Sequence, residues 1–331
     1  MSDQCGKTSA IICSYTFRRW QDLCQAIRSL QVQTPAIGEI IVVVDHNKEL
    51  EAAVREQFPS VIALPNSGPP GLSGARNSGI SASQGDFLLF LDDDARLAPG
   101  HLEPLLRHFS DENVIGVTAH VRPIWTVEAP SWFPREFLWV IGCTYDGQRS
   151  GPVRNLLGAC MVLRRSAVDK IGGFETGLGR TTSLFPMGGE ETEICIRAKR
   201  SFPSAVLLYD DGVHADHVVH TERVTLRYFT LRCFAEGLSK AHLVAMTDAP
   251  QGLSTERQYV QRVLAKGLSG RLRNLVLRRD WPAAGQAGAI VVGLAVTGVG
   301  YGLGRAARLF RPRHRGDRAS FARASSSGTP P

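Results

Sequence analysis

The sequence predicts an α/β fold in which an open, mostly parallel sheet is covered by helices. Apolar runs alternate with segments of helical periodicity over roughly the first hundred of the 331 residues. Two runs, residues 39–45 (EIIVVVD) and 86–91 (DFLLFL), are apolar at successive positions, which is typical of strands buried on both faces. Repeated strand–helix units of this length predict parallel strands joined by right-handed crossovers.

Local signals place the individual elements. Ser73 is a suitable N-cap for a helix, and Pro99 stands near the start of another, where its missing N–H costs little. The Gly- and Pro-rich residues 66–74 predict a loop. Strands are expected at residues 9–13, 39–45, 61–64, 86–91, 156–164 and 206–209. Helices are expected at residues 19–32, 48–58, 73–83, 99–109, 189–200, 221–246 and 255–277.

Residues 114–149 show weaker periodicity and hold a group of aromatic side chains. Its members within fifteen residues are Trp125, Trp132, Phe133, Phe137 and Trp139. Two interpretations carry equal weight: a core patch beneath a long loop, or one wall of an acceptor site.

Composition excludes several classes of protein. With 43% hydrophobic and 21% charged residues, the chain is neither disordered, nor collagen-like, nor a polytopic membrane protein. Residues 301–331 contain seven arginines and one acid, so they account for +6 of the formal charge of +7. The remaining chain is nearly neutral, and no nucleic-acid partner is expected.

Cysteine usage indicates a reducing compartment. The seven cysteines are scattered, their number is odd, and no Cys-x-x-Cys occurs. Free thiols in the cytoplasm are therefore expected, rather than disulfides or a zinc site. No apolar run follows a basic start at the N-terminus, so no signal peptide is expected.

Residues 281–304 form an uncharged, apolar segment between basic flanks. Its length would span a bilayer, but a buried or interfacial helix explains the same pattern. Arginines at both ends suit anionic headgroups. We expect peripheral or single-span contact with the inner face of the cell membrane, with the remaining protein in the cytosol.

The strongest chemical signal is three consecutive carboxylates, Asp92, Asp93 and Asp94, directly after a buried strand. The carboxyl ends of strands are where open α/β sheets bind ligands. Clustered carboxylates repel one another, so a cation is expected among them, and oxygen ligands favour Mg²⁺ or Mn²⁺. The alternative is an acidic turn that caps the next helix.

Two upstream features support a ligand at this edge. Asp45 ends the EIIVVVD strand and is placed to hydrogen-bond a base or ribose, although a strand-ending turn residue would look alike. Residues 71–79 (GLSGARNSG) combine glycines, Arg76 and a helix start. Backbone N–H groups and one guanidinium suit a diphosphate.

These residues together resemble the family 2 glycosyltransferases of GT-A fold. The motifs that carry the resemblance are Ser14-Tyr15, VVVD, GLSGARNSGI, GDFLLFLDDDA, IGGFE and GGEETEICIRA, in that order over residues 8–245. The resemblance implies that Asp92 and Asp94 hold a divalent ion and the sugar nucleotide, with Asp93 between them. It also implies that Asp45 recognises the nucleoside.

The resemblance further implies a catalytic base at Glu190 and Glu191. Glu191 stands where the family usually has Asp, one methylene shorter, and its carboxylate would take the proton of the acceptor hydroxyl. A charged helix N-terminus explains the same residues without catalysis. Among His214, His217 and His220, His217 best fits the histidine that many GT-A enzymes place on the metal or diphosphate; a zinc site of all three lacks the usual helix context.

The expected organisation is a GT-A domain over residues 1–245, a helical extension over 246–310 that is expected to contact the membrane, and a basic, disordered tail over 311–331. The expected activity is metal-dependent, inverting transfer of one sugar from a nucleoside-diphosphate sugar, first a UDP-sugar, to a glycan or lipid-linked acceptor. A Gln-x-x-Arg-Trp motif and several membrane helices, usual in processive members, are missing from the sequence. A catalytically weak binding protein of the same fold and a sugar nucleotidyltransferase remain as alternatives.

Overall fold

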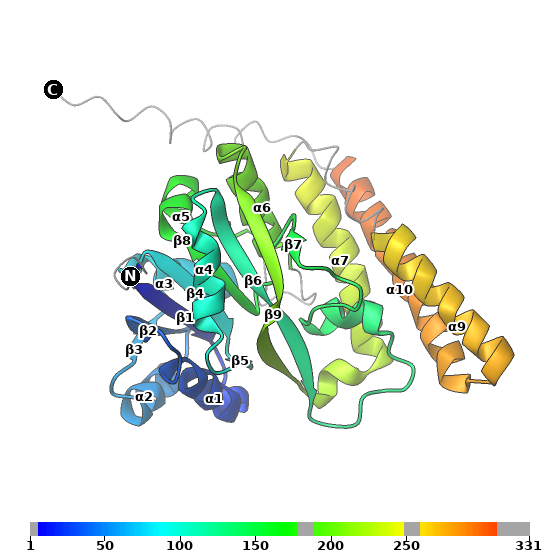
Figure 1. The fold of residues 1–331 in the computed structure, drawn as a ribbon, viewed down its shortest axis with the longest axis horizontal. Coiled ribbons are helices and arrows are strands. Elements are labelled where there is room, and N and C mark those ends of the chain that lie inside the picture. The colour runs from blue at the N-terminus through cyan, green and yellow to red at the C-terminus, as the bar shows by residue number, and fades with distance from the viewer. Residues whose placement is uncertain (1–5, 178–187, 248–258, 310–331) are drawn as a thin grey trace.

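The structure is a computed structural model that describes residues 6–177, 188–247 and 259–309. Within these residues the chain forms one sheet of nine strands, in the order β3-β2-β1-β4-β8-β6-β9-β5, with β7 paired to β9 (Figure 1). The α/β fold predicted from the sequence is confirmed.

Parallel strands form the N-terminal half of the sheet. They are β1 (Thr8–Ser14), β2 (Glu39–Val44), β3 (Ile62–Pro65) and β4 (Phe87–Asp92). In the register, Cys13 of β1 lies opposite both Val43 of β2 and Asp92 of β4. The carboxyl ends of these strands therefore share one edge of the sheet.

Helices cover both faces of this half, which explains why its strands are apolar at successive positions. Ile12 contributes to the core shared with α1 (Trp20–Gln31) and α2 (Lys48–Gln57). Its neighbour Ile11 contributes to a second core shared with α3 (Leu72–Ala82). Successive side chains of a strand point to opposite faces, so both must be apolar here.

The other half of the sheet is mixed. Strand β8 (Cys160–Arg164) pairs antiparallel with β4 and with β6 (Val114–Trp125). Strand β9 (Val206–Val219) runs parallel to β6 and antiparallel to β5 (Ala95–Leu97).

One long strand is not predicted from the sequence, and another is longer than predicted. The weak periodicity of residues 114–149 concealed β6, whose second half is only partly buried. The strand expected at residues 206–209 continues to Val219, past an irregular register that follows the exposed residues Asp211 and Gly212. Polar residues on a partly solvated strand weaken the pattern by which strands are recognised.

Further helical segments connect these strands. They are the helices α4 (Leu102–Arg107), α5 (Arg165–Ile171) and α6 (Glu190–Ser201) and the 3₁₀ segments η1 (Phe17–Arg19), η2 (His108–Ser110), η3 (Arg135–Ile141) and η4 (Thr221–Val224). The short strand β7 (Gly151–Pro152) lies between η3 and β8 in the sequence.

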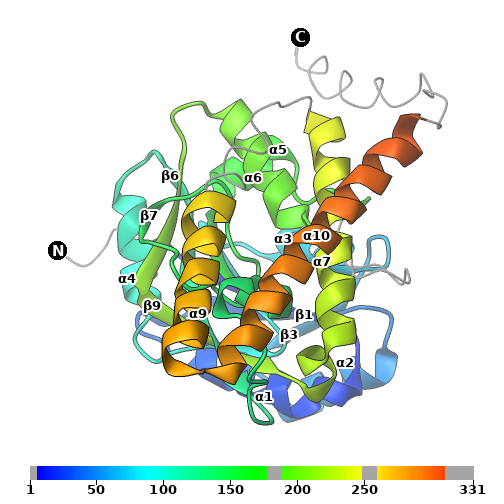
Figure 2. The ribbon, with the colours of Figure 1, turned by 90° about the vertical axis from the view of Figure 1, so that its right-hand side faces the viewer.

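The C-terminal part of the described chain is helical, as expected. It contains α7 (Leu226–Thr247), the π-helical segment η6 (Tyr259–Leu264), α9 (Ala265–Arg278) and α10 (Trp281–Leu309). Helices α9 and α10 form the outer layer, with α7 between α10 and the sheet (Figures 1 and 2). Residues 255–258 of an expected helix and the expected tail over 311–331 lie outside the described residues.

The predicted aromatic group divides between two roles. The rings of Trp132, Phe133 and Phe137 lie 5.6, 5.6 and 5.3 Å from the ring of Phe229 in α7, so these three belong to the core. Trp139 packs against the edge of this core, and both Phe137 and Trp139 line a cavity. The core interpretation is thus confirmed for these rings, and the acceptor-wall interpretation stays a prediction.

Glycines allow α7 and α10 to approach until their backbones touch. A Cβ on Gly300 of α10 would meet the carbonyl oxygen of Phe234, and one on Gly237 of α7 would meet the carbonyl oxygen of Thr297 and, at 2.6 Å, the backbone nitrogen of Tyr301. Backbone atoms cannot turn aside as a side chain can, so this contact requires glycine.

Two alanine substitutions in α10 should therefore have opposite effects on stability. Gly302 meets nothing within 4 Å of an added Cβ, so Gly302→Ala should stabilise by about 0.5–1 kcal/mol through helix propensity. Gly300→Ala should destabilise by about 1–3 kcal/mol, because the helices must separate. Urea unfolding of both variants checks this, and equal effects would contradict the backbone contact.

Candidate functional site

Polar side chains meet where β1, β2 and β4 end. Ser14 is the last residue of β1, Asp92 the last of β4, and Asp45 follows β2, with its N–H bonded to the carbonyl oxygen of Ser14 at 2.8 Å. This is the edge at which the sequence places a ligand.

Asp92, Asp94 and His217 offer a set of ligand atoms that lie within 4.8 Å of one another. Strand pairing brings them together across the chain, because β5 follows the carboxylates and pairs with β9, with Ala95 opposite His217. The N–H of Val218 also donates to the carbonyl oxygen of Asp94 at 2.8 Å. The structure thus brings together the three residues that the sequence assigned to a metal.

Asp94 is the most heavily contacted carboxylate of the site. Its Oδ1 lies 3.1 Å from Nε2 of His217, and its Oδ2 lies 3.0 Å from Arg223 and 3.2 Å from Arg19. Burial alone would raise the pKa of Asp94, but these three neighbours hold it well below its usual range. Asp94 is therefore ionised and fixed in direction, as a metal ligand requires.

Asp93 is tied to the β1 side of the site. It accepts hydrogen bonds from the Ser14 hydroxyl at 2.7 Å and from Arg19 at 2.9 Å. Burial raises the pKa of Asp93 against the opposing charge of Arg19. Its contacts join the carboxylate run to the first strand and to η1.

Asp45 shapes the loop that precedes α3. One carboxylate oxygen accepts from the Asn66 amide at 2.7 Å and also lies 2.7 Å from Nδ1 of His46. The other accepts from the N–H of Gly71 at 2.8 Å. The sequence assigned Asp45 to the nucleoside. In the structure Asp45 follows β2, and its carboxylate contacts the loop that leads into α3.

Arg76 connects the two groups of carboxylates. Its side chain is 2% exposed, and its guanidinium lies 3.2 Å from Glu191, 3.6 Å from Glu190 and 3.6 Å from Asp92. It also stacks over the Phe174 ring at 5.1 Å. Burial alone would lower the pKa of Arg76, but the neighbouring carboxylates raise it.

The two glutamates occupy the first turn of α6 and differ in exposure. The Glu190 side chain is 3% exposed and that of Glu191 is 20% exposed, and both line the cavity beside Asp92. Any side chain at Gly158 would collide with Glu191 and, at 2.7 Å, with Arg76. Glu191 is thus the carboxylate better placed to meet a second substrate.

The chemistry of the Asp92, Asp94 and His217 set fits a divalent cation. Carboxylate oxygens suit Mg²⁺ and Mn²⁺, and a neutral imidazole nitrogen is a common ligand of transition metals. The Cys143 sulfur lies 3.9 Å from Nδ1 of His217, which leaves Nε2 on the Asp94 side of the ring.

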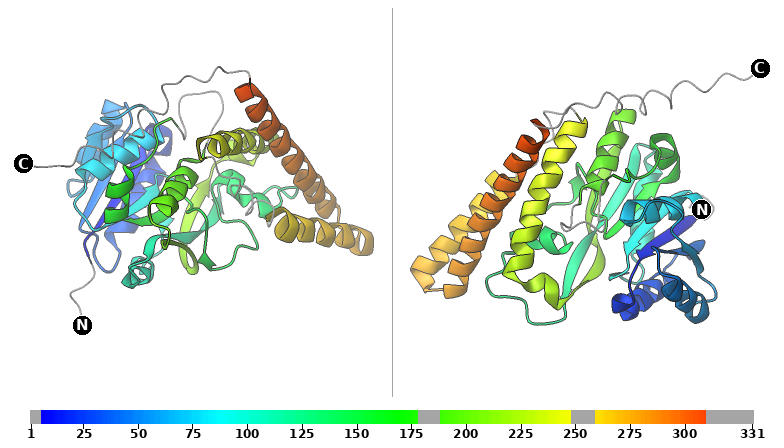
Figure 3. Two further views of the ribbon diagram at one scale, coloured as in Figure 1. Left: turned by 90° about the horizontal axis from the view of Figure 1, so that it is seen from above. Right: turned by 180° about the vertical axis from the view of Figure 1, so that it is seen from behind.

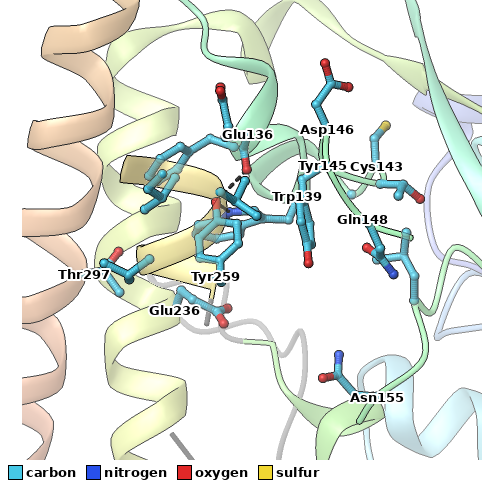
Figure 4. Close-up of a pocket in the computed structure, with 18 of the residues that line it drawn as sticks. Glu136, Trp139, Cys143, Tyr145, Asp146, Gln148, Asn155, Glu236, Tyr259 and Thr297 are labelled. Carbon is cyan, nitrogen blue, oxygen red and sulfur yellow. Dashed lines mark hydrogen bonds between the residues drawn. The ribbon is translucent and has the colours of Figure 1, made fainter. Parts of the chain in front are cut away.

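A cavity of about 1660 Å³ extends from Asp92 and the two glutamates to the C-terminal helices. Its wall includes Asp92, Glu191 and residues of α7, α9 and α10, and α7 meets the glutamate side directly, where Ser239 accepts from the N–H of Gly188 at 3.3 Å. Figure 4 shows Trp139, Tyr145 and Tyr259 along this wall; the Tyr259 hydroxyl donates to the carbonyl oxygen of Glu136 at 2.6 Å and accepts from Trp139. The cavity holds room for a second substrate beside the carboxylates.

An ion pair fixes the C-terminal helices to the cavity wall. Arg271 of α9 contacts the Glu136 carboxylate through two nitrogens, at 2.6 and 2.8 Å, and donates to Gln286 of α10 at 2.8 Å. Bidentate arginine–carboxylate pairs are geometrically specific. The aromatic wall and α9 therefore hold a defined relative position.

Sequence reasoning missed two arginines of the site. Arg19 and Arg223 contact Asp94, but neither belongs to a motif, and only proximity in the fold reveals them. The neighbouring histidines do not join the cluster: the His214 ring lies 5.4 Å from the ring of His101, and Nε2 of His220 lies 3.0 Å from Asp22.

Comparison with known proteins shows which family the chain resembles. The family model "Glycosyl transferase family 2" matches residues 9–172. The chain is 28% identical over 301 residues to a glucosyl-dolichyl phosphate glucuronosyltransferase of Haloferax volcanii, covering 89% of this chain and 95% of the relative. It is 27% identical over 244 residues to the succinoglycan biosynthesis protein ExoM of Rhizobium meliloti, covering 71% and 74%.

Two solved structures share the fold. A mannosyltransferase of Pyrobaculum calidifontis, in complex with GDP-Man and Mn²⁺, superposes with a TM-score of 0.57 at 16% identity, covering 94% of this chain and 82% of its own. GalNAc-T7 with UDP, GalNAc and Mn²⁺ gives 0.52 at 17%, covering 78% and 55%. Sequence family and fold agree, and the chain belongs to the family 2 glycosyltransferases with the GT-A fold.

Proposed function

We propose that this glycosyltransferase moves one sugar from a nucleoside-diphosphate sugar to a hydroxyl of a lipid-linked acceptor at the inner face of the cell membrane. The observation that carries the proposal is the joining of Asp92 to Glu191 through Arg76 within one cavity. The donor would lie at the Asp92 side and the acceptor at the Glu191 side.

On the donor side, Asp92, Asp94 and His217 would hold Mg²⁺ or Mn²⁺. When bound, the ion supplies charge stabilisation to the diphosphate leaving group. Asp45 would receive the nucleoside at the loop it fixes, with Asp93 holding that side of the site to β1. A UDP-sugar is the first donor to test, and the two solved relatives were complexed with UDP or GDP-Man.

On the acceptor side, Glu191 would remove the hydroxyl proton while the oxygen attacks the anomeric carbon. The bond to the sugar forms as the bond to the diphosphate breaks, with inversion expected for the family. Glu190, more deeply buried, would support the first turn of α6. Arg76 directs Glu191, since it is buried between the two carboxylate groups.

A lipid-linked acceptor is supported by two observations. The Haloferax volcanii relative is named for action on glucosyl-dolichyl phosphate, and its similarity covers most of both chains. The cavity also ends at the apolar helix α10. The reaction would then be a step in polysaccharide, glycolipid or glycoconjugate synthesis.

The metal assignment predicts a specific loss in Asp94→Asn. Wild-type transfer should stop in EDTA and return with Mn²⁺, whereas the variant should bind Mn²⁺ at least about tenfold more weakly and lose most turnover. Asp169→Asn, which changes an exposed carboxylate on α5 outside the ligand set, is the control and should keep its Mn²⁺ affinity. Calorimetric titration with Mn²⁺ measures this; wild-type turnover in EDTA would refute the assignment.

The base assignment predicts a loss of turnover without a loss of donor binding. Glu191→Gln should lower kcat by about 10²- to 10⁴-fold, because the amide cannot accept the proton. Glu191→Asp should retain part of the activity, since relatives usually carry Asp there. Steady-state kinetics and donor titration decide: a parallel loss of donor affinity would make Glu191 a donor ligand.

Steady-state kinetics and donor titration also distinguish two roles for Arg76: positioning of Glu191 and direct binding of the diphosphate. Arg76→Met should lower kcat on the order of 10²-fold, because the substitution frees Glu191 from its partner. Donor affinity should fall by a smaller factor, because Asp92 also loses a contact but Asp94 and His217 keep theirs. Arg76→Lys keeps the charge but loses the planar contacts, so it should recover only part of kcat. If Arg76→Met instead loses donor affinity as fully as turnover, Arg76 binds the diphosphate, as the sequence indicates.

A further inference from the structure

Helices α9 and α10 present an apolar surface on the outside of the molecule. We call it the α9–α10 face and define it by the exposed side chains Leu272, Val276, Leu277, Trp281, Val291, Val292, Val299 and Leu303. Figures 2 and 3 show both helices at the periphery, with α10 between α9 and α7. An exposed apolar surface of this extent marks an interaction site.

Charge identifies the kind of partner. Residues 259–309 contain eight lysines and arginines and a single acid, Asp280, whose carboxylate caps the start of α10. On α9 and at the α9–α10 turn, the exposed apolar side chains are interspersed with Lys266, Arg273, Arg278 and Arg279. An apolar surface among cations complements an anionic lipid bilayer, where acyl chains meet negative headgroups.

The packing of α10 decides how it meets the membrane. The helix is long and apolar enough to cross a bilayer, yet its opposite side packs along α7, where the backbones touch at Gly300 and Gly237. Helix α7 carries the ion pair between Lys240 and Glu236, at 2.9 Å. If α10 spanned the membrane, it would either lose its packing against α7 or bring Lys240 and Glu236 into the hydrocarbon core. The second choice carries a large free-energy penalty.

We infer that the α9–α10 face lies in the plane of an anionic membrane, partly immersed, and that α10 does not span it. This extends the proposed function by giving its lipid acceptor a route. The inner side of the same helices lines the cavity through Leu294, Thr297 and Asn274, and the cavity continues to Glu191. A head group can then enter from the surface while its lipid chain stays in the bilayer.

Vesicle binding by the full chain tests the inference. Flotation with phosphatidylcholine vesicles, with and without phosphatidylglycerol, should show binding that requires the anionic lipid. Val292→Glu/Val299→Glu, at side chains 45% and 57% exposed, should lower partitioning at least about tenfold. The matched control, Val32→Glu, changes an equally exposed valine (61%) beside α1 and should bind as the wild type does.

Depth measurements separate the in-plane position from a span. Fluorophores on cysteines placed at Gly288, Ala295 and Gly302, all on the exposed side of α10, should be quenched to similar, shallow depths by spin-labelled lipids. A span requires Ala295 to lie deepest, near the bilayer centre, and this result would overturn the inference.

Three other outcomes would also overturn it. They are failure to bind any vesicle, binding unchanged by the two glutamates, and a solution dimer that the glutamates dissociate in the absence of lipid. An assay with a short-chain, water-soluble acceptor tests the proposed function separately from membrane binding. The double variant should retain transfer to that acceptor. If the wild-type chain binds vesicles but transfers no sugar, the proposed function is refuted and the membrane docking still stands.

Discussion

Two buried guanidinium groups and one that is partly buried allow five carboxylates to lie together at one end of the sheet. Arg19 and Arg223 contact Asp94, while Arg76 lies between Asp92 and the glutamates of α6. Without these cations, the carboxylates would repel one another in a region of low dielectric. The arginines therefore fix the direction of the proposed metal ligands and of the proposed base, and they join the side proposed for the donor to the side proposed for the acceptor.

Strand pairing brings these charges together. Parallel strands bring Ser14, Asp45 and Asp92 to one edge, and this part could be predicted, because buried strands and the polar residues that end them leave a clear pattern. The pairing of β5 with β9 could not, since β5 is only three residues long and β9 is interrupted by an irregular register around the exposed residues Asp211 and Gly212. That pairing nevertheless sets His217 beside Asp94.

The same division holds for the site residues. Motifs in order along the chain identified Asp92, Asp94 and the Glu190–Glu191 pair, because each follows a strand or opens a helix. Arg19 and Arg223 were missed, because single arginines on short 3₁₀ segments carry no pattern. Arg76 was identified as a diphosphate ligand, whereas its contacts in the structure are with carboxylates, a relation that depends on how α3 meets α6 in space.

The C-terminal helices form part of the wall of the cavity that holds Asp92 and Glu191. The Glu136–Arg271 pair ties α9 to the aromatic wall of the cavity, so the surface proposed to meet lipid and the site proposed to act on it belong to one packed unit.

The most direct test of the account is mass spectrometry of a reaction with UDP-sugars, Mn²⁺ and a polyprenyl-phosphate-linked sugar. The account predicts an acceptor heavier by one sugar, formed only with metal; an unchanged acceptor across nucleoside-diphosphate donors, or one extended by many sugars, would contradict it.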